Sequence, residues 1–310
     1  MSIEEELARL SPDKDTLLAI GVFDGVHLGH KDLISQLVAQ ARQQDLLSGV
    51  VTFRQHHQEV LQPGTKLPFL TDLIERNYLL KDEGVEVIIP LTFTTESARL
   101  NARQFVGLLK KYLRLHGLII GPDFALGRNR EGNADTLRAL GQEMNFSVMV
   151  VSAVMMNGEV VSSTAIRKAL AEGDMKKVHS LAGRPFSLHG HVGTGAGRGV
   201  ELGFPTANLD IAPEQALPAD GVYACWAYID GKVYQSMTNI GINPTFGGDK
   251  RAVEVYVVAY HGDLYGCELK IDIVERLRDE KKFKTVAELK RQVAEDVKRG
   301  KAILNSEGGK

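Results

Sequence analysis

A turn rich in glycine and histidine stands between the first buried strand expected in this sequence and the helix that follows. It spans residues 21–30 and reads GVFDGVHLGH. Glycines let a backbone approach a ligand closely, and a helix N-terminus offers free N–H groups and positive dipole to a phosphate. His27 and His30 can both face that phosphate and stabilise charge developing during an in-line phosphoryl transfer. Taken alone, the turn is equally compatible with ordinary loop or capping histidines.

A second phosphate-binding element is expected where another helix opens, in the segment 161–167 with the sequence VSSTAIR. Arg167 would present its charged fork to a phosphate bound at this helix terminus. A surface helix with a solvated arginine is the commoner structure for such a sequence. The presence of the histidine turn elsewhere in the same half of the chain favours phosphate binding.

The segment 190–203 is too rich in glycine for a strand interior. It is expected to form either a flexible linker or a loop whose N–H groups wrap phosphates, and it lacks the Gly-Lys-Ser/Thr of a Walker A loop. Thr206 and Asn208 follow it, two residues apart, and their oxygens suit Mg²⁺ bound together with nucleotide phosphates. The alternative is an ordinary turn rich in Pro, Thr and Asn.

Glu254 is an isolated acid within the apolar run 253–258. Such a carboxylate is unfavourable unless it faces solvent, a metal or a substrate hydroxyl. As a general base it would take the proton of a primary alcohol that attacks the γ-phosphate of ATP. On an edge strand it could instead be a solvent-facing residue of a regular alternation.

The elements that must position these residues change in character near residue 184. Before it, β-branched runs alternate with helical periodicity, which predicts a parallel sheet covered by helices on both faces, with ligands bound beyond the carboxyl ends of the strands. After it, alternating strands, an Asp230-Gly231 hairpin signal and a terminal helix predict antiparallel β structure. The predicted domains are 1–183 and 184–310. The expected strands are 17–23, 49–53, 86–91, 117–121, 146–154, 222–229, 232–240, 253–260 and 268–274, and the expected helices are 30–47, 72–82, 102–116, 134–144 and 286–304.

Composition excludes several classes of protein. With 44% hydrophobic and 25% charged residues the chain is neither disordered nor fibrous. A net charge of −2 does not favour nonspecific electrostatic binding to nucleic acid or to an acidic membrane. The two cysteines give neither a disulfide framework nor a zinc site, and the acidic N-terminus does not resemble a secretory signal. We expect a cytoplasmic monomer or weak oligomer whose partners are small molecules.

The histidine turn and the SSTAIR segment resemble the nucleotidylyltransferase superfamily, and specifically the N-terminal half of bacterial bifunctional riboflavin kinase/FAD synthetases. Residues 121–132, GPDFALGRNREG, are similar to that family's G-x-D-F-x-F-G-x-x-R-x-G motif. The resemblance implies a Rossmann-like fold in which FMN attacks the α-phosphorus of ATP, giving FAD and pyrophosphate. It assigns catalysis to His27, His30 and Arg167, ATP binding to Gly21, Phe23, Gly25, Gly29, His56, Ser162, Ser163 and Thr164, and flavin binding to Asp123, Phe124 and Arg130.

One departure from the family affects the loop after the second strand. The family usually has T-F-x-P-H-P there, whereas residues 52–57 read TFRQHH, so His56 is retained while both prolines are absent. Without proline the loop loses its restraint on φ. A riboflavin kinase with a slow or specialised adenylyltransferase half is therefore kept as an alternative.

The second half of the chain resembles the riboflavin kinase module. The motifs occur in the family's order at 190–208, 239–246, 253–254, 263–266 and 277–283. The resemblance implies a six-stranded antiparallel barrel with a C-terminal helix, Mg²⁺–ATP at Thr206 and Asn208, and Glu254 as the base acting on the ribityl 5′-hydroxyl of riboflavin. It places a phosphate loop at Gly190, Gly193, Gly195, Gly197, Arg198 and Gly199, and a flavin wall at Arg278 and Phe283. A flavin- or nucleotide-binding regulator without turnover is the alternative from another class.

Overall fold

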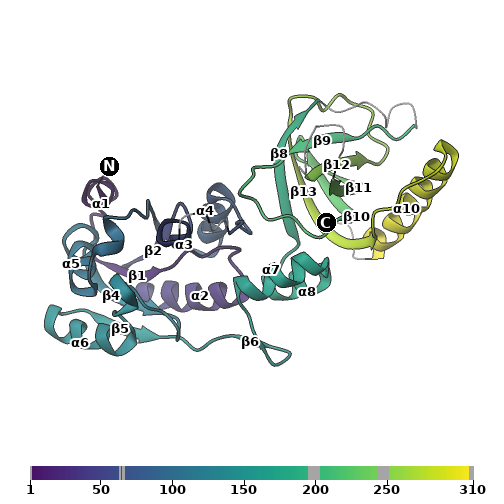
Figure 1. Cartoon of the computed structure of the whole chain (residues 1–310). Coiled ribbons are helices and arrows are strands. Elements are labelled where there is room, and N and C mark those ends of the chain that lie inside the picture. Colours follow the sequence, from purple (N-terminus) through teal and green to yellow (C-terminus); the bar gives the residue numbers. More distant parts are fainter. Residues whose placement is uncertain (1, 63, 65–66, 195–202, 243–250, 307–310) are drawn as a thin grey trace. The chain divides into compact units, whose positions relative to one another are not determined.

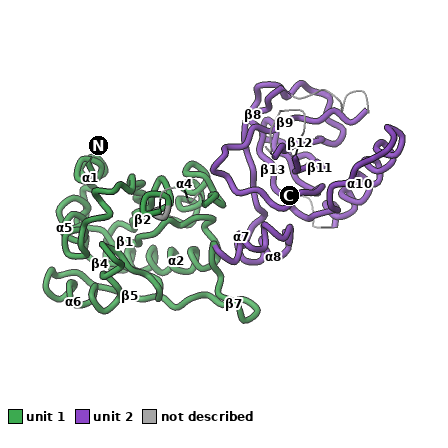
Figure 2. Tube along the Cα trace, viewed as in Figure 1, with its two compact units in different colours: residues 1–163 green, residues 164–310 purple. Residues whose placement is uncertain are grey.

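The computed structural model describes residues 2–62, 64, 67–194, 203–242 and 251–306 (Figure 1). The chain forms two compact units, residues 1–163 and residues 164–310 (Figure 2). The helices α7 (Ser163–Glu172) and α8 (Met175–Ala182) follow this division. Their packing explains its place, because α8 contacts two barrel strands and Leu170 of α7 accepts a hydrogen bond from the N–H of Ala219. The predicted domain boundary after residue 183 rests on the change of sequence pattern there and stays a prediction.

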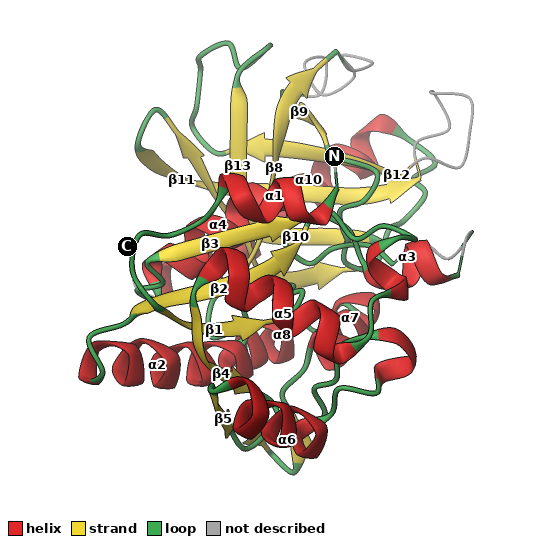
Figure 3. Ribbon diagram, turned by 90° about the vertical axis from the view of Figure 1, so that its left-hand side faces the viewer, coloured by secondary structure: helices red, strands yellow, loops and turns green. Residues whose placement is uncertain are grey.

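A five-stranded parallel sheet, in the order β3-β2-β1-β4-β5, forms the centre of the first unit (Figure 3). Each strand is a short apolar run, and helices or loops make the crossovers that parallel pairing requires. The strands are β1 (Thr16–Ile20), β2 (Leu47–Phe53), β3 (Val87–Leu91), β4 (Leu115–Ile120) and β5 (Ser147–Val150). The predicted parallel sheet is confirmed, with strand bounds that differ by a few residues from those expected.

Alternate residues of these strands enter two separate cores, one on each face of the sheet. Leu18 and Ile20 belong to the core built with α1, α5 and α6, whereas Leu17 and Ala19 belong to the core built with α2 and α4. This alternation is the two-residue period of a strand buried on both sides. The helices of the unit are α1 (Ile3–Arg9), α2 (Leu28–Gln43), α3 (His57–Leu61), α4 (Leu73–Asp82), α5 (Ala102–Leu113) and α6 (Ala134–Met144), with the 3₁₀ turns η1 (Ser97–Arg99) and η2 (Arg128–Arg130).

The run expected as one strand over residues 146–154 is shorter in the structure. β5 ends at Val150, and a small hairpin of β6 (Met155–Met156) and β7 (Glu159–Val160) follows. Asn157 and Gly158 connect its two arms with positive φ angles of 50° and 79°. Two central residues with positive φ are typical of a type I′ hairpin turn, for which Asn-Gly is the preferred sequence.

A closed barrel in the strand order β10-β11-β12-β9-β8-β13 forms the second unit, and all its pairings are antiparallel. Tyr223, Cys225 and Ala227 of β10 are buried, while their neighbours Val222 and Ala224 form a second cluster with α10 (Val286–Ser306). The fold class is therefore confirmed: an α/β unit followed by a six-stranded barrel with a terminal helix. The strands are β8 (Phe186–Gly193), β9 (Ala207–Asp210), β10 (Gly221–Ile229), β11 (Lys232–Ile242), β12 (Arg251–Val257) and β13 (Glu268–Arg278).

The start of the glycine-rich segment corrects one prediction. Gly190 and Gly193 were expected in a linker or phosphate loop, but both lie in strand β8. A Cβ added to Gly190 would lie 2.1 Å from the carbonyl oxygen of Asp210, so the close approach of β9 explains glycine within a strand. The other residues of the predicted phosphate loop, Gly195, Gly197, Arg198 and Gly199, lie outside the described residues.

Candidate active sites

The first candidate site lies at the carboxyl edge of the parallel sheet. The strand order reverses direction between β1 and β4, which are neighbours although β2 and β3 intervene in sequence. Ligands of open α/β sheets bind at such a switch point. The predicted motif 21–30 directly follows β1, and the predicted motif 121–132 directly follows β4. The topology thus brings together two segments that sequence analysis assigned separately to ATP and to flavin.

The turn after β1 has an unusual backbone. Phe23, Gly25 and Val26 all have positive φ, at 53°, 81° and 34°. Non-glycine residues adopt this region at a cost of about 1–3 kcal/mol each, and such strain collects at functional sites. A side chain would also not fit at position 25, because a Cβ there would lie 2.9 Å from Leu70 Cδ1. Packing therefore contributes to the choice of glycine at this position of the turn.

The two histidines of this turn lie against each other. His27 is the N-cap of α2, and its Nδ1 accepts the backbone N–H of His30 at 3.3 Å. Their rings are stacked with centroids 3.7 Å apart and an angle of 16° between the planes. Because Nδ1 accepts this bond, the ring proton of neutral His27 sits on Nε2, which makes that atom a donor. The capping alternative and the phosphate-binding prediction are therefore compatible.

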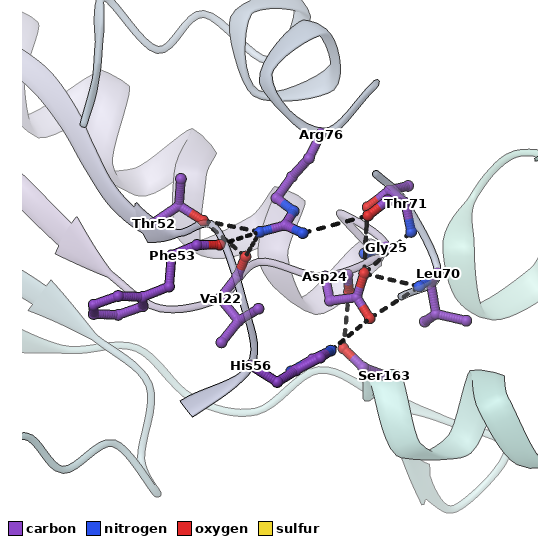
Figure 4. Close-up of polar contacts among 10 residues, drawn as sticks. All are labelled: Val22, Asp24, Gly25, Thr52, Phe53, His56, Leu70, Thr71, Arg76 and Ser163. Carbon is purple, nitrogen blue, oxygen red and sulfur yellow. Dashed lines mark hydrogen bonds and ion pairs between the residues drawn. The ribbon is translucent and has the colours of Figure 1, made fainter. Parts of the chain in front are cut away.

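A buried polar cluster lies directly beneath this turn (Figure 4). The side chain of Asp24 is 2% exposed and accepts hydrogen bonds from the N–H groups of Leu70 and Thr71 at 2.9 and 3.1 Å. His56, which follows β2, brings its Nε2 to 3.7 Å from Asp24 Oδ2. The His56 ring also stacks on Phe69 with centroids 4.1 Å apart. In this loop, which lacks both prolines, the His56 ring is buried and stacked.

Arg76 of α4 completes the cluster and is fully buried. Its Nη1 donates to the carbonyl oxygens of Val22 and Phe53 at 3.0 and 2.8 Å, and its Nη2 donates to that of Thr71 at 3.3 Å (Figure 4). Burial lowers the pKa of this guanidinium, and the nearby carboxylates of Asp24 and Asp72 partly offset the effect. Arg76 therefore ties the chain beyond β1 to the end of β2 and to the loop before α4.

The predicted flavin-binding residues of the first unit share one loop after β4. Arg130 Nη2 donates to the carbonyl oxygen of Asp123 at 2.9 Å, and Phe124 packs against the hydrophobic core. A bridge between Leu126 and Gly132 closes the loop.

The predicted phosphate-binding residues near α7 begin at its first turn. Ser163 Oγ donates to the backbone carbonyl of Asp24 at 2.8 Å. Ser162 immediately precedes the helix, Thr164 is exposed, and Arg167 is half-buried within α7. Asp24 therefore contacts a third segment that carries predicted ATP-binding residues.

The second candidate site lies on the outer wall of the barrel. Strand register places Glu254 of β12 directly opposite Asn208 of β9 and Asn239 of β11. Directly paired residues point to the same face of a sheet, so the carboxylate stands between two carboxamides. Asn239 Nδ2 in turn donates to Glu280 Oε1 at 3.4 Å. Glu254 is half-buried and Thr206 is exposed just before β9.

The donor set at this wall fits Mg²⁺ held together with nucleotide phosphates. Asn208 offers a carboxamide oxygen and Thr206 a hydroxyl oxygen, and Mg²⁺ is usually bound by one or two protein groups plus phosphates and waters. Across the residues with described coordinates, no group of three or more His, Cys, Asp or Glu could hold a metal by itself.

Arg278, predicted as part of a flavin wall, forms a buried ion pair in the structure. Its Nε lies 3.0 Å from both carboxylate oxygens of Asp296 on α10, and its Nη2 lies 2.8 Å from Oδ2. The guanidinium also lies 5.8 Å from the ring centroid of Phe283. Arg278 therefore holds the terminal helix to β13 in addition to any contact with flavin.

Sequence analysis missed three polar residues of these sites: Asp24, Arg76 and Asn239. Asp24 was visible within the histidine turn, but one acid beside two histidines carries no periodic signal. Arg76 sits on a helix whose apolar face is weakly defined, so its complete burial could not be read from spacing. Asn239 is a neighbour of Glu254 only through strand register.

Known protein families match both halves of the chain. A family model described as FAD synthetase matches residues 10–165, and one described as riboflavin kinase matches residues 182–304. A bifunctional riboflavin kinase/FMN adenylyltransferase of Escherichia coli K12 is 34% identical over 92% of each chain. The chain belongs to this family. Its activities are therefore riboflavin kinase and FMN adenylyltransferase, with ATP and flavins as substrates and products.

Other relatives cover the chain almost completely. The enzyme of the same name from Pseudomonas fluorescens is 34% identical over 98% of each chain, and that from Listeria monocytogenes is 34% identical over 92% of this chain. A solved structure from Streptococcus pneumoniae, described as a macrolide-efflux protein, superposes with a TM-score of 0.89 at 30% identity and covers 95% of this chain and 96% of its own. Among the residues with described positions, no helix is long and apolar enough to cross a membrane.

Proposed function

We propose that residues of the first unit, together with Arg167, carry out adenylyl transfer from ATP to FMN. An oxygen of the FMN phosphate attacks the α-phosphorus, a new P–O bond forms, and the bond to pyrophosphate breaks. His27 and His30 donate to the phosphates during this step, and Arg167 neutralises their charge. The stacked pair at the α2 N-terminus supports the proposal, because the helix dipole favours an anion at the same place.

ATP phosphates would also meet the backbone around Gly21, Phe23, Gly25 and Gly29, and the segment Ser162–Thr164. FMN would lie against the loop that carries Asp123, Phe124 and Arg130. Support comes from the strand order, which puts this loop beside the histidine turn at the switch point. The contacts of His56 with Phe69 and Asp24 support an ordinary adenylyltransferase over the slow or specialised alternative.

In the second unit, Glu254 acts as the general base of the riboflavin kinase. It accepts the proton of the ribityl 5′-hydroxyl while that oxygen attacks the γ-phosphorus of ATP and ADP leaves. The position of Glu254 on β12 directly opposite Asn208 on β9 supports this proposal. Thr206 and Asn208 would hold Mg²⁺, which when bound neutralises charge on the phosphates. Gly195, Gly197, Arg198 and Gly199 would contact phosphates, and Arg278 and Phe283 would line the flavin.

Glu254→Gln tests this assignment because the chain has two measurable activities. The variant should lose FMN formation from riboflavin by at least about a hundredfold, as expected for removal of a general base, while making FAD from supplied FMN normally. Chromatography of the flavin products measures both. Glu268→Gln is the matched control, since Glu268 is exposed on β13 of the same barrel. Normal FMN formation by Glu254→Gln would refute the base, and loss of both activities would refute two separate sites.

The remaining expectations concern partners and place. The enzyme should act on small molecules without nucleic acid or membrane, as a monomer or weak oligomer in the cytoplasm. These statements stay predictions.

A further inference from the structure

Asp24 is placed unlike any other acid of the first unit. It lies within the histidine turn, yet its carboxylate is 2% exposed and is enclosed by protein donors. Leu70 N–H donates to Oδ1 at 2.9 Å and to Oδ2 at 3.0 Å, and Thr71 donates from its N–H at 3.1 Å and from Oγ1 at 3.4 Å. A carboxylate covered in this way acts on its protein neighbours rather than on a substrate.

Three segments that carry proposed ATP-binding residues meet at Asp24. The turn to which it belongs continues into His27, its Oδ2 lies 3.7 Å from His56 Nε2, and its carbonyl oxygen accepts the hydroxyl of Ser163 (Figure 4). A second hydrogen bond joins the histidine turn to the loop before α4, because the N–H of Gly25 donates to Thr71 Oγ1 at 3.0 Å. These segments are far apart in sequence, and Asp24 is the residue they share.

The electrostatics of the cluster depend on this one carboxylate. Fully buried Arg76 places its guanidinium among backbone oxygens, and its positive charge is stabilised by Asp24 and Asp72. Removing the charge of Asp24 would leave buried donors with a weaker acceptor and a buried cation with less compensation. His56 and the loop before α4 would then lose the group that fixes their positions.

We propose that Asp24 is a positioning residue for adenylyl transfer, which holds His56 and the 70–71 backbone in place beneath the phosphate-binding turn. The proposal rests on the proposed contact of His56 with ATP. Asp24 touches no reacting atom. A change at Asp24 therefore weakens the binding and alignment of ATP, and it affects FMN binding at the loop after β4 less.

Asp24→Asn tests this role, because the substitution keeps the size of the side chain and removes its charge. The KM for ATP in FAD formation should rise at least about tenfold, as loss of hydrogen bonds to a charged group predicts, and the KM for FMN should change less than about twofold. Riboflavin kinase activity of the same molecules should stay within about twofold of the parent, since its proposed residues lie in the second unit. Asp45→Asn is the matched control, because Asp45 is exposed and makes a surface ion pair with Lys14.

Comparison with His56→Ala separates this inference from the proposed function. If Asp24 acts through His56, the double variant should be no more impaired than the worse single variant. An unchanged KM for ATP in Asp24→Asn, or a lower kcat alone, would overturn the inference even when His56→Ala is impaired. A normal His56→Ala enzyme would overturn both the ATP contact and the inference. If Asp24→Asn does not fold, Thr71→Val, which removes a donor to the same carboxylate, should raise the KM for ATP about threefold, and an unchanged KM there would overturn the proposal.

Discussion

The ion pair between Arg278 and Asp296 gives a quantitative prediction about the terminal helix. The side chains are 14% and 7% exposed, and three N–O distances between them are 2.8–3.0 Å. Removing one partner of a buried pair costs about 3–5 kcal/mol because the other charge stays buried. Arg278 keeps a bond to the carbonyl oxygen of Asp279, so we expect Asp296→Ala to lower the free energy of unfolding by the smaller figure, about 3 kcal/mol.

The assay follows heat inactivation of the two activities in one chain. At roughly 4 °C per kcal/mol for a unit of this size, the midpoint for riboflavin kinase should fall by about 12 °C. The midpoint for FMN adenylyltransferase should fall less, because most of its proposed residues lie in the first unit. Glu295→Ala is the control, because Glu295 is the exposed neighbour on α10. The double variant Arg278→Met with Asp296→Leu should recover part of the loss, since no charge is then left unpaired. A kinase midpoint for Asp296→Ala within about 2 °C of the parent would refute the reasoning.

Two further predictions concern the barrel. Gly190→Ala should destabilise the second unit by about 2 kcal/mol, because the new Cβ would lie 2.1 Å from the Asp210 carbonyl oxygen. Gly193→Ala on the same strand is the control for thermal midpoints, because no atom of the described residues lies within 4 Å of its added Cβ; equal midpoints would contradict the explanation. Burial raises the pKa of the Cys225 thiol to about 12, whereas Cys267 is exposed, so a maleimide at neutral pH should modify the native chain at Cys267 and leave Cys225 intact. Mass mapping of modified peptides checks this, and native labelling of Cys225 would show that the barrel interior opens.

The fold could be predicted from the sequence because both units rely on periodic patterns. Strands of the first unit are apolar runs buried on two faces, and the helix Ala134–Met144 was predicted to the residue. The prediction of a loop in the glycine-rich segment failed at Gly190, because the reason for glycine lies in another strand. The Asp210 backbone excludes a side chain at this position. Local composition cannot report such a contact, since it joins residues that are distant in sequence.

The candidate sites were predictable to the extent that their residues stand in short motifs. His27 and His30 share one turn, and their stacking follows from their spacing at a helix start. Asp24 and Arg76 were missed because their importance comes from burial and from partners on other elements. Glu254 was found as an isolated acid, but its alignment with two carboxamides depends on the register of three strands.

The helices α7 and α8 have a consequence for how the two activities can be separated. Gly173 between them packs on Arg276 of β13, and Lys176 of α8 pairs with Glu275 at 3.2 Å. A cut after residue 183 would strip the barrel of this covering and expose apolar residues such as Val178 and Leu181. On the proposed assignment, a cut after residue 163 would remove Arg167 from the adenylyltransferase. If Arg167 acts as proposed, each activity expressed alone should keep its own copy of α7, and the barrel should also keep α8.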